Sequence, residues 1–198
     1  MLPIQDALPS GRTPIATLLL LAVNAGVFAA ELVVPGSASN TSGLSPFMHP
    51  SAPHFVVNAL FLWLFGDNVE ARLGRAWFVT TYLASAIAGL LVDVRLASGG
   101  DSGIGAGATC AISGILGAYF VLLPKSRVLT LVPAPPVVTE IPAVVFLAFW
   151  WLLHVASFAF ARGTEPAGIP SASILWGLIT GFAVGGAIAA AARRPVAW

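Results

Sequence analysis

Charged side chains are scarce in this chain of 198 residues. Only 9% of its residues are Asp, Glu, Lys or Arg, whereas 58% are hydrophobic. Soluble domains carry roughly a quarter charged residues, so the composition excludes a water-soluble globular protein. The nine basic and eight acidic residues nearly cancel, and this balance gives no nucleic-acid signal. We therefore expect an integral membrane protein that does not bind nucleic acid.

Cysteine is also almost absent, since Cys110 is the only one in the chain. One cysteine excludes an intrachain disulfide and a metal cluster held by cysteines. We expect neither a metal site nor a small-molecule cofactor.

Long hydrophobic runs, by contrast, recur along the whole chain. A bilayer core about 30 Å thick needs roughly 20 apolar residues per helix. Several of the runs are shorter than this, and such helices are tolerated when neighbouring helices bury them. We therefore expect the second and fourth runs to be central. The sequence predicts an all-α fold, one membrane domain over 1–198 with six transmembrane helices, at about 14–34, 53–65, 76–92, 107–123, 141–161 and 171–192.

The distribution of Lys and Arg predicts the orientation in the membrane. Basic residues concentrate on the cytoplasmic side of membrane proteins. With a cytoplasmic start, two basic residues lie outside and seven lie inside, the seven being Arg12, Arg72, Arg75, Lys125, Arg127, Arg193 and Arg194. We expect both termini in the cytoplasm and location in a bacterial inner membrane.

Two polar stretches then open to the outer side. In HFVVN, His54 and Asn58 are four residues apart and share one helix face. In GATCAISG, at 107–114, a hydroxyl and a thiol stand side by side at the start of an apolar helix. Polar groups inside membrane helices are costly and are functional or hydrogen-bonded to a partner. The spacing alone leaves both a functional site and a packing role open.

Small residues recur at helical spacing in the fourth and sixth runs. The fourth carries Gly105, Thr109, Ser113 and Gly117, and the sixth carries Gly177, Gly181 and Gly185. Such stripes allow two membrane helices to approach closely. Ile174 lies one turn before Gly177, so we expect it close to Thr109.

Three longer stretches of the chain resemble the rhomboid family of intramembrane serine proteases. FMHPSAPHFVVNALFLWLFGDNVEARLGR is similar to the family's H-x-x-x-N helix and the following G-x-x-x-E-x-x-x-G loop, with Gly66, Glu70 and Gly74. GATCAISGILGAYFVLLP resembles the helix of the nucleophile, and IPAVVFLAFWWLLH resembles the fifth span. The resemblance implies the rhomboid fold.

Carried over by position, the resemblance implies a changed catalytic dyad. His54 and Asn58 fall on the oxyanion-stabilising positions, with His49 as a further polar residue at the mouth. The nucleophile position falls on Thr109, and the glycine that follows it in the family is Cys110. The position of the catalytic histidine falls on Ile174. A hydroxyl needs a base within hydrogen-bond reach, and isoleucine cannot act as one.

Two other residues are candidates for the missing chemistry. His154, on the fifth span, is the one remaining histidine that could serve as a relocated base. Cys110 as a replacement nucleophile is disfavoured, because one residue along a helix turns its side chain about 100° from Thr109. A small buried cysteine packed against a neighbour is the better interpretation.

Two functions follow from these residues. The first is a non-catalytic rhomboid pseudoprotease that binds the transmembrane segments of other membrane proteins. The second is an active intramembrane serine-type endopeptidase that uses Thr109 with a relocated base. A transporter is disfavoured, because no paired charged residues appear in mid-membrane.

Overall fold

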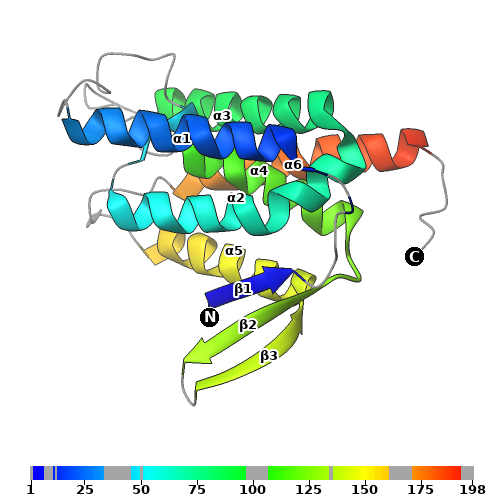
Figure 1. The fold of residues 1–198 in the computed structure, drawn as a ribbon. Helices are drawn as coiled ribbons and strands as arrows, with labels where there is room; N and C mark the ends of the chain where they lie inside the picture. Colours follow the sequence, from blue (N-terminus) through cyan, green and yellow to red (C-terminus); the bar gives the residue numbers. More distant parts are fainter. Residues whose placement is uncertain are drawn as a thin grey trace.

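Six helices form a bundle in which they run alongside one another (Figure 1). The structure, a computed structural model, describes residues 2–6, 11, 13–33, 46–49, 51–96, 107–133, 136–160 and 171–192. The helices are α1 (Ile15–Val33), α2 (Ala52–Leu73), α3 (Arg75–Leu96), α4 (Gly107–Leu122), α5 (Ala143–Phe160) and α6 (Ser171–Ala192). We call the end where α4 ends and α5 begins the hairpin end, and the opposite end the mouth end.

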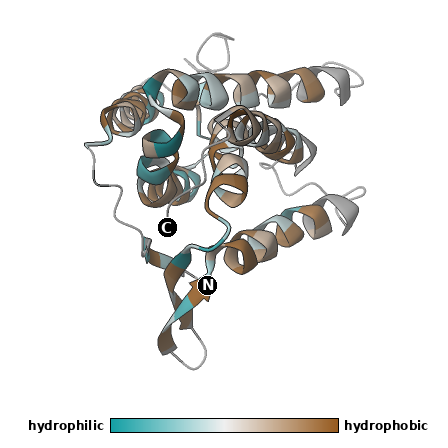
Figure 2. Cartoon of the chain, turned by 90° about the vertical axis from the view of Figure 1, so that its right-hand side faces the viewer, coloured by the Kyte–Doolittle hydropathy of each residue, from teal (hydrophilic) through white to brown (hydrophobic). Residues whose placement is uncertain are grey.

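The helices are suited to a membrane by length and hydropathy. Within the described residues, three helical segments are long and apolar enough to cross a bilayer: Ile15–Val33, Arg75–Val92 and Ile174–Ala191. Two shorter apolar helices, Ala108–Leu122 and Ala143–Ala156, accompany them. Hydrophobic residues predominate along most of the helices in Figure 2. The predicted all-α membrane bundle is confirmed.

The second helix is longer than the sequence predicts. The hydrophobic run suggests an end near 65, but α2 continues to Leu73. The helix ends at Gly74, whose φ of 77° lies in the left-handed region that favours glycine. The apolar run indicates which residues of α2 suit hydrocarbon. The helix itself continues beyond that run and ends at the glycine, where the backbone can turn. The predicted loop at 66–73 is therefore wrong.

Glu70, on the last part of α2, holds the start of α1. Its carboxylate accepts hydrogen bonds from the backbone N–H groups of Ala16 (3.1 Å) and Thr17 (2.8 Å) and from the Thr17 hydroxyl (2.9 Å). Arg75 Nε lies 3.7 Å from the same carboxylate. The first N–H groups of a helix have no partner within it, and a carboxylate stabilises them and the positive end of the helix dipole. Glu70 thus orders the hairpin end.

A small antiparallel sheet lies at the hairpin end, and the sequence did not predict it. Its strands are β1 (Leu2–Asp6), β2 (Arg127–Pro133) and β3 (Pro136–Pro142), in the order β1-β2-β3. The proline-rich segment at 131–142 contributes to strands β2 and β3 and ends where α5 begins; proline does not fit inside a helix.

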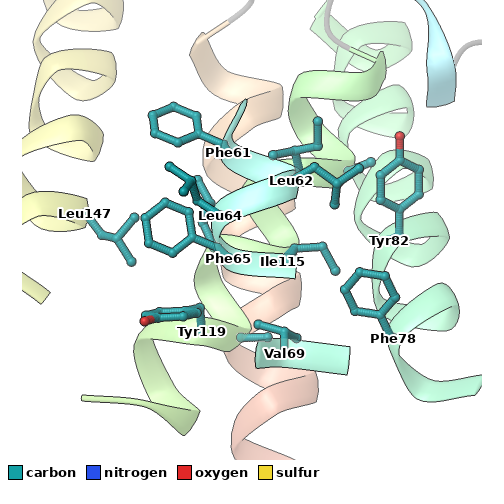
Figure 3. Close-up of a cluster of buried hydrophobic side chains, with 14 of the residues drawn as sticks. Phe61, Leu62, Leu64, Phe65, Val69, Phe78, Tyr82, Ile115, Tyr119 and Leu147 are labelled. Carbon is teal, nitrogen blue, oxygen red and sulfur yellow. The ribbon is translucent and has the colours of Figure 1, made fainter. Parts of the chain in front are cut away.

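The helix α4 is the centre of the bundle. Every residue from 108 to 119 is buried, as expected for a short, central helix. Figure 3 shows the surrounding core, in which side chains of α2, α3, α4 and α5 converge. Phe65 stacks edge-on against Tyr119, with ring centroids 4.9 Å apart. The expectation for α2 is met only in part, because Trp63 is 56% exposed on its outer face.

The predicted close pairing of α4 and α6 is confirmed, with a correction to the α4 face. A Cβ built on Gly177 or Gly181 would clash with the backbone of Cys110 or Gly114, respectively, and one on Gly185 would lie 3.0 Å from Ala118 Cα.

The α6 glycines therefore meet the Cys110–Gly114–Ala118 stripe. Of the predicted stripe, Gly117 also contacts α6, since a Cβ on it would lie 2.5 Å from the Leu178 carbonyl oxygen. Both stripes consist of small residues, so composition could not distinguish them. Gly105, the first residue of the predicted stripe, lies outside the described residues.

Candidate functional site

A cavity of about 260 Å³ lies at the mouth end between α2, α4 and α5. The described residues that line it are Pro53, His54, Val57, Asn58, Thr109, Trp150 and His154. Its volume is just below the usual range of small-molecule pockets. The cavity suits one or two side chains of another segment better than a cofactor.

Thr109, at the nucleophile position, lies at the start of α4 and is held by α2. Asn58 Nδ2 donates a hydrogen bond to Thr109 Oγ1 at 2.9 Å, and both residues are buried. One turn further along, the Ser113 hydroxyl donates to the Thr109 carbonyl at 2.7 Å. The first bond holds the Thr109 hydroxyl against α2, and the second lies within α4.

His54 is positioned by the residue that precedes α2. Its Nδ1 lies 2.8 Å from Ser51 Oγ. Ser51 occupies the N-cap position of α2, but its side chain makes no capping hydrogen bond. The serine hydroxyl thus orients the imidazole, and Nε2 remains as the second polar atom of a ring that lines the cavity.

Ile174, which the resemblance assigns to the position of the family's histidine, lies beside Cys110. Its side chain is fully buried and packs with Cys110, and Trp150 packs against this pair. Ile174 is not among the described residues that line the cavity. Its packing partner is the residue after Thr109, because the α6 face meets the Cys110 stripe. The interpretation of Cys110 as a small buried packing residue is confirmed.

His49, predicted as an accessory residue at the mouth, lies outside the cavity. Its ring packs edge-on against Phe28 and Phe55, with centroids 6.1 and 5.2 Å away, and is 5% exposed. Neither ring nitrogen has a hydrogen-bond partner among the described residues. Burial is the main cause that lowers the pKa of His49, to about 4; a hydrogen bond with the Phe47 backbone opposes this shift, and the nearby His54 adds slightly to it. His49 is therefore neutral near pH 7.

His154 does line the cavity, together with Thr109. Its ring stands edge-on to Trp150, with centroids 4.3 Å apart. Trp150 in turn contacts Phe61 at 5.4 Å between centroids. Trp150, which Phe61 of α2 contacts, thus flanks the imidazole at the cavity.

Three residues of the site received no weight in the sequence analysis. Pro53 and Val57 line the cavity beside His54 and Asn58. Val57 lies three residues after His54, so the helical period that links His54 to Asn58 also predicts its position. The partner of His54, Ser51, was identifiable as a helix-start residue before Ala-Pro, although nothing in the sequence predicted its bond to an imidazole.

The arrangement places hydrogen-bond donors beside the buried Thr109 hydroxyl. Asn58 carries a second amide N–H, and His54 a second nitrogen. These groups can stabilise an oxyanion near Thr109.

Known proteins resemble this chain in sequence. A family model described as the Rhomboid domain matches residues 41–193. A relative from Saccharomyces cerevisiae, "Rhomboid protein 1, mitochondrial", is 37% identical over 95 residues. The aligned region covers 46% of this chain and 28% of the yeast protein, so the match spans less than a third of that relative.

Proposed function

Because the chain belongs to the rhomboid family, we propose that it is a non-catalytic member that binds transmembrane segments of other membrane proteins. The observation that carries this proposal is the burial of Ile174 against Cys110. Hydrocarbon fills the place that the family's histidine would occupy, so the Thr109 hydroxyl lacks its base. The cavity and its donors are nevertheless kept.

The bound segment enters between α2 and α5. Both helices contribute to the cavity, and Val57, an apolar residue that lines it, is 43% exposed. A neighbouring helix in the bilayer meets such a surface without leaving hydrocarbon. A polar or unwound end of that helix would find hydrogen-bond donors at His54 and Asn58. The partners are thus client transmembrane helices and the surrounding lipid.

We also propose that the hairpin end faces the cytoplasm of a bacterial cell. Four basic residues that favour this orientation lie at the hairpin end, at helix ends or between elements or at the start of β2. They are Arg72, Arg75, Lys125 and Arg127.

Photocrosslinking tests segment binding. A photoreactive phenylalanine analogue at Val57, which lines the cavity, should crosslink to a model transmembrane segment reconstituted in the same vesicles. The matched control is Val56, which is more exposed (60%) but does not line the cavity. We expect at least several-fold more adduct from position 57. Equal adducts from both positions would mean that the segment meets α2 by random collision, and the proposal would be wrong.

His154 supports a second candidate function, proteolysis with a relocated base, because it shares the cavity with Thr109. A fluorophosphonate probe separates the two candidates, since it labels only an activated hydroxyl. We expect no labelling of the unaltered protein and none after Thr109→Ser, because a better-shaped hydroxyl still lacks a base. Labelling at Thr109 that disappears with His154→Ala would establish the active enzyme.

A further inference from the structure

The β2–β3 hairpin projects from the hairpin end in an unusual direction. In Figure 1, both strands slant away from the bundle and back toward the level of the mouth end. Figure 2, turned by 90°, shows the same hairpin outside the helices. The helices of this bundle occupy the membrane, so the far end of the hairpin is directed toward the bilayer.

The half of the hairpin far from the bundle is apolar on both faces. We call Leu131, Val132, Val137 and Val138 the distal half. Leu131 pairs with Val138, and Val132 pairs with Val137, and successive pairs point to opposite faces of the sheet. Val137 and Val138 are 49% and 53% exposed. An apolar end on a strand pair this exposed is unfavourable in water.

The half nearer the bundle is polar on its exposed side. Arg127 Nη1 lies 3.7 Å from Glu140 Oε2, and both side chains are more than half exposed. Gln5 of β1 is exposed and pairs with Leu129, the partner of Glu140. The inward residues Val128 and Thr130 are fully buried. Polarity thus changes along the hairpin, from charged at the bundle to apolar at the far end.

The backbone of the far end also suits hydrocarbon. Residues 133, 135 and 136 are all proline, and proline has no N–H group to leave unsatisfied in lipid. One of these prolines, Pro136, is the first residue of the edge strand β3, so this strand offers no N–H donor at its far end to an added strand. The composition therefore favours lipid over a peptide strand as the partner.

We propose that the distal half inserts into the lipid leaflet at the hairpin end, with Arg127 at the level of the phosphates. A seven-residue strand is about 23 Å long, and the headgroup layer is roughly 5–8 Å thick. The hairpin is therefore long enough to reach the acyl chains even when it is inclined. Its charged half then lies among the lipid headgroups and its apolar half among the acyl chains, as in other interfacial anchors.

Spin labelling in nanodiscs that hold one protein molecule each tests this proposal. Val138→Cys and, as the matched control on the polar half, Gln5→Cys are labelled in a Cys110→Ala background. Oxygen concentrates in the bilayer and a nickel chelate stays in water. We expect the ratio of oxygen to nickel accessibility to be several-fold higher at position 138 than at position 5. Adding Val137→Glu should lower the ratio at position 138, whereas Val137→Leu should not.

Two outcomes would overturn the proposal. Equal nickel accessibility at positions 138 and 5 in nanodiscs would mean that the distal half stays in water. Protection of position 138 that is absent in nanodiscs and arises only in crowded proteoliposomes would show that a second copy covers it, and not lipid.

Discussion

A variant that carries Thr109→Ser, Cys110→Gly and Ile174→His should react with a fluorophosphonate and cleave a model transmembrane substrate. Ile174 packs directly on Cys110, the neighbour of Thr109 in the chain, so Cys110→Gly makes room beside Thr109 for an imidazole at position 174. A positioned general base contributes about 10²–10⁴-fold to such reactions. We expect a gain of that order over the unaltered protein, measured as substrate cleaved per hour in proteoliposomes.

Single changes should give almost none of this gain. A nucleophile and its base act as a unit, so their effects are far from additive. The matched control keeps Cys110→Gly and Ile174→His but has Thr109→Ala, and it should be inert. Adding Asn58→Ala to the active variant should reduce its rate by at least about tenfold, because an oxyanion donor is lost.

An inert but folded variant would contradict this prediction, and a crosslink identifies the reason. Ile174→Cys in the otherwise unaltered protein should form a disulfide with Cys110 under mild oxidation, whereas Ile179→Cys on the exposed side of α6 should not. If the disulfide forms and the triple variant is still inert, the cavity differs from that of an active protease at more than the two dyad residues. Without it, the packing of Ile174 on Cys110 would be wrong.

The second large effect concerns the contact between α4 and α6. Gly181→Leu should prevent stable folding, because even a Cβ at this position would clash with the backbone of Gly114. Backbone cannot move aside as a flexible side chain can, so we expect destabilisation of about 3 kcal/mol or more. Unfolding in mixed micelles of increasing SDS content measures the loss.

The matched control lies on the same helix. Gly186 has no atom within 4 Å of a built Cβ, so Gly186→Leu should leave stability within about 0.5 kcal/mol of the unaltered protein. Similar losses at both positions would show that leucine disfavours α6 for reasons unrelated to α4, and the close contact would then be wrong.

Much of the fold could be predicted from hydropathy, because the thickness of the bilayer core sets the length of each transmembrane helix. The end of α2 could not, since it depends on Gly74 and on the partners of Glu70, which come from α1. The pairing of β1 with β2 could not be predicted from the sequence either. Leu2 and Leu131 are register partners, but a five-residue strand gives no local sign of a partner so far along the chain.

The site shows the same division between local and distant information. The shared face of His54 and Asn58 follows from helical period, and the cavity contains both. The choice between the Thr109 and Cys110 stripes of α4 depends on the rotation of one helix against another. Two neighbouring stripes of small residues, offset by 100°, give no means to fix that rotation from sequence.

The pairing of β1 with β2 also sets an order of events during synthesis. The partner strand emerges only after α1, α2, α3 and α4 have been made, roughly 125 residues later, which is on the order of 10 s at ribosomal speed. During that time the first strand has no partner, and the helix that follows it inserts alone. The sheet then closes the chain segment that spans four helices, so the residues of β1 are among the last of the described residues to be fixed in place.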